Sequence, residues 1–88
     1  MISKRILFFG KVQGVGFRYF VKKAQEGLEI NGFVMNLPEG QVELAVEGSP
    51  EQLEVLMKRI RERFSDNITE TEEQEVDFQS YDDFTIRS

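Results

Sequence analysis

The spacing of apolar residues in the first third of the chain predicts a strand followed by a helix. Residues 4–12 contain a run of bulky apolar side chains, Ile6 to Phe9, without clean alternation. Such a run is typical of a central strand that is buried on both faces. From Phe17 the period changes to that of a helix, with apolar side chains at positions 17, 20, 21, 24 and 28. We interpret this stripe as core packing and expect the helix to end near Gly27 and Glu29.

The next segment predicts a hairpin. Residues 32–37 read as a strand, and Leu37-Pro38-Glu39-Gly40 has the composition of a turn. Residues 41–47 then alternate well between bulky apolar positions and other positions. We expect one set to face inward (Val42, Leu44, Val46) and the other to face outward (Glu43, Ala45, Glu47).

A second helix and the last strands follow. Ser49 suits the helix N-cap, Pro50 the first turn, and Gln52 the reciprocal position of a capping box. Apolar residues again recur at helical spacing, at Leu53, Leu56, Met57, Ile60 and Phe64, until Ser65-Asp66-Asn67 interrupts the pattern. Residues 68–78, rich in Thr and Glu, predict another strand, and residues 84–86 a short final one.

This order of elements predicts an α+β fold and a single domain over residues 1–88. Strand, helix, strand, strand, helix, strand and a terminal strand suit a ferredoxin-like sandwich, βαββαβ plus a short C-terminal strand. Two helices would pack on one face of a four- to five-stranded, mainly antiparallel sheet, with right-handed crossovers. The fold alone indicates no function.

Composition narrows the chemistry. The chain has no cysteine and no histidine, which excludes disulfides, thiolate chemistry and cysteine-based metal sites, and removes the usual general base. The net charge is −5, yet residues 1–23 hold six of the eleven basic residues and none of the sixteen acidic ones. An acidic protein is a poor candidate for nucleic-acid binding, and the aromatic motifs of RNA-recognition modules are missing. A basic segment in such a protein instead suggests that it attracts one small anion.

The first apolar run of the chain bears on where the protein is located. The apolar run after Lys4 and Arg5 is too short for a signal peptide or a membrane span. We therefore expect a cytoplasmic protein without a membrane partner.

The acid-rich run between Glu70 and Asp77 could suggest a cation site, but it lacks the spacing and turn glycine of an EF-hand. A solvated strand face is the better interpretation, and we expect no metal site.

The stretch from Gly10 to Phe20 carries the candidate site. Gly14 and Gly16 lie where the strand pattern changes to the helical one, and Arg18 follows at once. Glycines permit a tight turn close to a ligand, the first amides of a helix attract anions, and an arginine adds a forked cation. A Gly-x-Gly turn alone is weak support for phosphate binding, because most such turns are only connections.

Several longer motifs make the interpretation specific. Gly-Lys-Val-Gln-Gly-Val-Gly-Phe-Arg-Tyr-Phe, at 10–20, closely resembles the active-site signature of the acylphosphatases, small enzymes that hydrolyse carboxyl–phosphate anhydrides. Residues 32–36 resemble the second motif of that family, which ends in an essential asparagine. Residues 39–43 resemble the turn and strand that follow it, and residues 84–87 the C-terminal strand.

The resemblance implies a ferredoxin-like enzyme without a cofactor. Its substrate would be a small acyl phosphate, its product inorganic phosphate, and we expect a monomer. On the matching positions, Arg18 and Asn36 would be the catalytic residues. The phosphate-binding loop would comprise Gln13, Gly14, Val15, Gly16 and Phe17.

Three departures and one alternative accompany this resemblance. Lys11 stands where arginine is commoner, Glu29 where glycine is common, and residues 64–67 replace a Gly-Pro stretch. The last two lie in the connections that follow the two helices, and none touches the proposed site. Taken without the motifs, Asn36 could be a turn former before Pro38. The alternative function is a non-catalytic ferredoxin-like module that binds a small anion or a protein.

Overall fold

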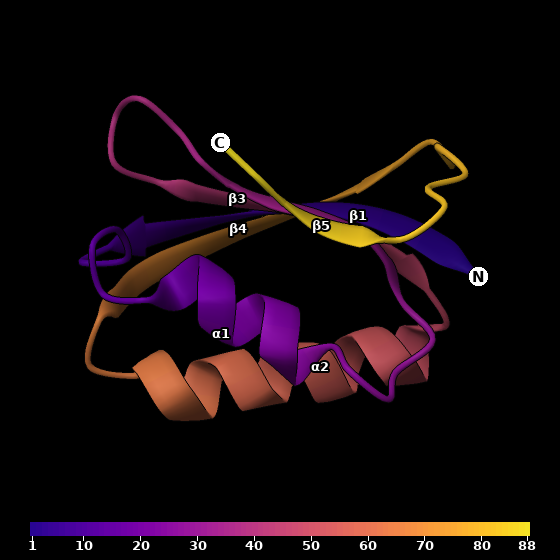
Figure 1. The fold of residues 1–88 in the computed structure, drawn as a ribbon, viewed down its shortest axis with the longest axis horizontal. Coiled ribbons are helices and arrows are strands. Elements are labelled where there is room, and N and C mark those ends of the chain that lie inside the picture. Colours follow the sequence, from indigo (N-terminus) through magenta and orange to yellow (C-terminus); the bar gives the residue numbers. More distant parts are fainter.

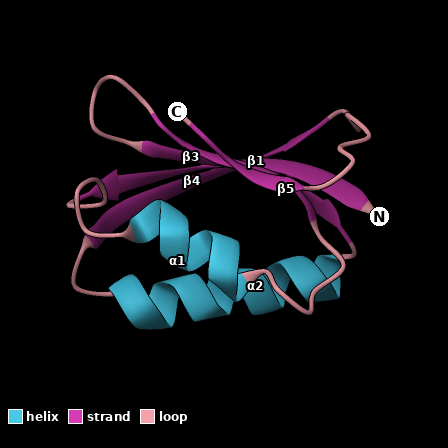
Figure 2. Ribbon diagram, in the orientation of Figure 1, coloured by secondary structure: helices cyan, strands magenta, loops and turns pink.

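Seven elements follow one another in the predicted order. The computed structural model describes all residues, 1–88, as β1 (Ile2–Gly10), α1 (Phe17–Ala24), β2 (Asn31–Asn36), β3 (Val42–Gly48), α2 (Pro50–Phe64), β4 (Ile68–Val76) and β5 (Phe84–Arg87). The strands form one sheet in the order β4-β1-β3-β2-β5, in which the β2–β5 pair is parallel and the other pairs are antiparallel. Both helices lie on one face of this twisted sheet (Figures 1 and 2). The predicted ferredoxin-like α+β sandwich is confirmed.

The core lies between the helices and the sheet. Seventeen buried apolar residues form one cluster there, contributed by both helices, by four of the strands and by the connections. Phe17 of α1 sits at its centre, with its ring 5.0 Å from that of Phe8 in β1 and 4.8 Å from that of Phe64 in α2. Full burial of a phenylalanine side chain contributes roughly 1.5–3 kcal/mol to the stability of the fold. These three packed rings therefore hold the first turn of α1 against the sheet.

Helix α1 is shorter than its apolar spacing predicts. It ends at Ala24 and does not continue to Leu28. After Ala24 the backbone tightens, with the Glu26 amide bonding the Lys23 carbonyl at 3.1 Å, and Gly27 then takes a left-handed φ of 81°. Arg59 of α2 donates to the free Ala24 carbonyl at 2.7 Å, and Leu28 still packs on the core from outside the helix.

Neither helix has the length and apolar character that crossing a bilayer requires.

Strands β1 and β3 also differ from expectation. Strand β1 spans Ile2–Gly10 instead of residues 4–12, and Leu7 and Phe9 are only half-buried because no second layer covers their face. In β3 the outward-facing Ala45 and Glu47 are buried, although we expected them in solvent. The connection between β4 and β5 accounts for Glu47: its carboxylate accepts hydrogen bonds from the backbone amides of Gln79 and Tyr81, and a third from the Ser3 hydroxyl.

The predicted hairpin and the second helix start are confirmed, with one change. The turn between β2 and β3 is closed by the Leu37 amide, which bonds the Gln41 carbonyl at 2.8 Å. At α2, the Ser49 hydroxyl accepts from the Gln52 amide at 3.2 Å, with Pro50 in the first turn. The Gln52 side chain does not complete a capping box. It accepts instead from the Glu29 amide at 3.2 Å and so links the first turn of α2 to the connection between α1 and β2.

Candidate active site

The loop between β1 and α1 is fastened to other elements at its start and in its middle. At its start, the Lys11 amide donates to the Asn67 carbonyl at 2.9 Å, and the Asn67 side chain donates back to the Lys11 carbonyl at 3.0 Å. In its middle, the Gln13 amide group donates to the carbonyls of Leu37 at 2.8 Å and Gln41 at 2.9 Å. The loop is therefore held between the connection after α2 and the β2–β3 turn.

Gly10 shows why the loop begins where it does. Its φ is +118°, and a Cβ at this position would come within 2.2 Å of the Asn67 carbonyl oxygen. Only glycine allows this approach. The segment 64–67, which departs from the family motif, thus still supplies the contact that fixes the start of the loop.

Gly14 and Gly16 have a different reason to be glycine. Both take left-handed φ angles, 75° and 79°, and a Cβ at either position would meet nothing within 4 Å. The backbone conformation requires glycine here, because a left-handed residue with a Cβ costs about 1–2 kcal/mol. The open space beside both glycines leaves the loop backbone accessible to a small ligand.

Helix α1 begins directly at this loop. Gly16 is its N-cap, and no side chain caps the helix start. The first intrahelical bond, from the Phe20 amide to the Gly16 carbonyl, is 3.0 Å long. The backbone amides in the first turn of α1 have no helical carbonyl before them that could accept their hydrogen bonds. They also lie at the positive end of the helix dipole. The start of α1 thus presents donors without an acid to neutralise them, since the first turn contains no acidic residue.

Arg18 lies in that first turn and remains without a carboxylate partner. Its Nη1 donates to the backbone carbonyl of Arg87 at 3.1 Å, which connects α1 to the end of β5. The ion pairs of the molecule do not include it. Two other basic residues of the N-terminal segment are neutralised, Lys4 by Glu73 and Arg5 by Glu43. Arg18 therefore keeps its positive charge available next to the loop.

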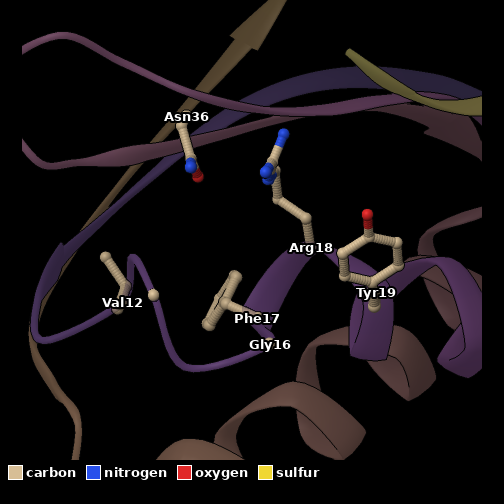
Figure 3. A pocket seen from close by; sticks show the side chains of 7 residues that line it. Val12, Gly16, Phe17, Arg18, Tyr19 and Asn36 are labelled. Carbon is tan, nitrogen blue, oxygen red and sulfur yellow. The ribbon is translucent and has the colours of Figure 1, made fainter. Parts of the chain in front are cut away.

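Asn36 comes to the same place from the end of β2. It pairs with Val42 across the hairpin and is half-buried. No hydrogen bond within the protein engages its amide group. Figure 3 shows this amide and the Arg18 guanidinium pointing into the same space beside the loop.

A pocket of about 120 Å³ joins these residues, lined by Val12, Gly14, Gly16, Phe17, Arg18, Tyr19 and Asn36 (Figure 3). Its volume is well below the roughly 300–1,000 Å³ of sites for drug-sized ligands, so it suits a small group. Arg18 is the one charged residue in the lining. The pocket can therefore attract an anion but offers no carboxylate as a general base.

Five of the seven sequence-predicted site residues line the pocket, and two do not. The Gln13 side chain bonds the β2–β3 turn and so holds the loop in place, and Val15 packs against the core. Sequence reasoning missed Val12 and Tyr19. The sequence pattern predicts Val12 at the end of a strand, but Val12 is fully buried within the loop. Tyr19 follows Arg18 and falls off the apolar stripe of α1, which was the available signal that its ring faces away from the core.

The acidic segment of β4 lies mostly in solvent. Most side chains of β4 are exposed, and no group of three or more acidic residues in the molecule is arranged to hold a metal ion. Glu73 instead accepts from Lys4 at 3.2 Å and lies 3.7 Å from Arg61.

The chain is similar to known acylphosphatases in both sequence and fold. The family model for acylphosphatase matches residues 4–86. An acylphosphatase from Bacillus pumilus is 39% identical over 99% of this chain and 99% of its own. One from Methanospirillum hungatei is 40% identical over 89% of this chain and 88% of its own. The crystal structure of acylphosphatase from Bacillus subtilis superposes with a TM-score of 0.88 at 29% identity, covering both chains completely.

Proposed function

The chain belongs to the acylphosphatase family, and from this premise we propose how its residues hydrolyse an acyl phosphate. Family membership makes the protein an enzyme that cleaves the carboxyl–phosphate anhydride. The non-catalytic binding module that the fold alone would allow is therefore set aside. The observation that carries the mechanism is the meeting of Arg18 and Asn36, from α1 and β2, at a loop with two left-handed glycines.

The phosphoryl group is held by the loop and Arg18. Backbone amides from Gly14 to Phe17 donate to its oxygens, and the free N–H groups of the Arg18 guanidinium bind two of them. Because these donors are fixed before the substrate arrives, they stabilise charge in the transition state without reorganisation. The pocket contains no carboxylate that would repel a dianion.

Asn36 places the attacking water. An amide can donate to and accept from a water without adding negative charge beside the phosphoryl group. The water oxygen attacks phosphorus in line with the bond to the acyl oxygen, that bond breaks, and the carboxylate departs. The proton of the water passes to a phosphoryl oxygen, because the pocket has no general base and the chain has no histidine. A carboxylate is a good leaving group and needs no strong acid.

Turnover of acetyl phosphate and benzoyl phosphate, with and without a chelator, tests this function. We expect steady hydrolysis that the chelator does not change and that inorganic phosphate inhibits competitively. A chelator-sensitive rate would contradict the cofactor-free mechanism, and lack of turnover of both compounds would contradict the function. The single domain over residues 1–88, the monomeric state and the cytoplasmic location stay predictions.

A further inference from the structure

Tyr19 is an aromatic residue whose position the core does not explain. It follows Arg18 in the first turn of α1, and 70% of its surface is exposed. Its ring takes part in none of the aromatic pairs of the molecule, which involve Phe8, Phe17, Phe20, Phe33, Phe64 and Tyr81. It nevertheless lines the pocket. An exposed ring at the edge of a small polar pocket is a surface on which a flat apolar group can pack.

The proposed mechanism sets the direction in which the acyl group leaves. In-line displacement requires the attacking water and the leaving carboxylate to lie on opposite sides of the phosphorus atom. Figure 3 shows Asn36 and Tyr19 on opposite sides of the Arg18 side chain. If Asn36 holds the water, the acyl group leaves on the side of the phosphorus atom away from Asn36. Of the two aromatic residues in the lining, Phe17 is buried, and Tyr19 is the exposed one that a departing acyl group can contact.

The charges near the pocket favour an uncharged acyl group. Arg18 is the one cation in the lining, and the phosphoryl group occupies it. The Arg87 guanidinium lies over the Phe33 ring, 3.8 Å from its centre. Lys22 and Lys23 lie in the last turn of α1, outside the pocket. No second cation therefore lines the pocket to receive a carboxylate or phosphate on the acyl part.

We propose that Tyr19 contacts the acyl group of the substrate and favours uncharged aromatic acyl phosphates over small or anionic ones. This inference rests on the proposed function of the same pocket. The ring packs on the acyl group both in the bound substrate and as the carboxylate departs, so the preference is measured by kcat/KM.

The experiment compares kcat/KM for benzoyl, acetyl and succinyl phosphate in four proteins: the wild type, Tyr19→Ala, Tyr19→Phe and Phe78→Ala. Phe78 is a matched control, because it is another exposed aromatic residue and lies outside the pocket. We expect the wild type to prefer benzoyl phosphate and to use succinyl phosphate least. In Tyr19→Ala the benzoyl-to-acetyl ratio should fall roughly two- to tenfold, the range that one aromatic contact provides.

The controls separate this inference from the function itself. Tyr19→Phe and Phe78→Ala should keep the wild-type ratio, and inorganic phosphate should inhibit all four proteins equally. An unchanged ratio in Tyr19→Ala would overturn the inference and leave the proposed function intact. A ratio that falls equally in Tyr19→Phe would overturn the role of the ring, and a preference for succinyl phosphate would overturn the uncharged class. Failure of the wild type to hydrolyse any of the three would overturn the function and the inference together.

Discussion

Arg18 and Arg87, 69 positions apart in the sequence, are joined by a 3.1 Å hydrogen bond from the Arg18 guanidinium to the Arg87 carbonyl. The carbonyl belongs to the last residue of β5, whose own side chain lies over Phe33 of β2. The bond uses one donor of Arg18 and leaves the others without a partner in the protein. The direction of the proposed phosphate-binding cation therefore depends on an edge strand at the far end of the chain.

Replacing Arg18 should nearly abolish activity. We expect Arg18→Ala to lose about 3–4 kcal/mol of transition-state stabilisation, comparable to the loss of a preorganised oxyanion donor, and to lose inhibition by inorganic phosphate. Arg18→Lys should recover little, because a point charge cannot reproduce the fork of the guanidinium. The measurements are kcat, KM and the phosphate inhibition constant. Near-normal values for Arg18→Lys would contradict two-point binding of the phosphoryl group.

The left-handed conformation of Gly16 should matter for phosphate binding more than for folding. Gly16→Val forces a branched side chain to φ 79°, so the loop must change shape and its amides must lose their direction. Gly27→Val is the matched control, since Gly27 has φ 81°, open space around it and a place beyond the other end of α1. Both variants should lose about 1–2 kcal/mol of stability. Only Gly16→Val should weaken phosphate inhibition, and equal inhibition in the two would remove the loop amides from the site.

Asn36 should affect the chemical step more than binding. Asn36→Ala is expected to fold, because Val34 and Phe33 of the same strand stay buried, and to lower kcat far more than phosphate affinity. Asn36→Asp should weaken turnover and phosphate binding together, since its charge repels the dianion, and salt should reduce that penalty at an open pocket. Kinetics, phosphate inhibition and the thermal midpoint distinguish the cases. A folded Asn36→Ala protein with wild-type kcat would show that the residue only ends a strand.

Gln13 should support the site without contacting the substrate. Gln13→Ala removes both side-chain bonds that hold the loop to the β2–β3 turn. The two bonds together contribute about 2 kcal/mol, so we expect phosphate affinity to fall by up to roughly thirtyfold while the benzoyl-to-acetyl ratio stays constant. Gln79→Ala, which removes a side-chain bond to the Asp77 carbonyl far from the pocket, is the control. Equal phosphate affinity in both variants would refute the positioning role.

Glu47 should stabilise the fold through the acceptor it provides. Glu47→Ala leaves the Ser3 hydroxyl and the amides of Gln79 and Tyr81 without their partner in a buried place. We expect a loss of about 2–3 kcal/mol in the free energy of unfolding, measured in urea. The exposed Glu75→Ala on β4 should change it by less than about 0.5 kcal/mol. Similar losses in the two variants would mean that these hydrogen bonds give no net stabilisation.

The sequence by itself determined the order of elements, the fold class and most of the pocket lining. Period-two and helical spacings are local, and they give the right element type wherever one face is buried and the other is solvated. Gly14, Gly16, Phe17 and Arg18 are close in the chain, so a strand-to-helix turn brings them together at once. Asn36 was assigned through a longer motif, because its own surroundings suggested only a turn.

Only the tertiary structure decided the rest, because the deciding contacts join residues far apart in sequence. Glu47 looked solvated in an alternating strand, and it is buried because a connection more than thirty residues later folds over it. Gln13 is predicted as part of the phosphate-binding loop, and only the fold shows that its side chain bonds the hairpin turn. Helix α1 ended early where Arg59 bonds its last carbonyl. Local spacing shows which side a residue faces, but not what else in the chain comes to cover that side.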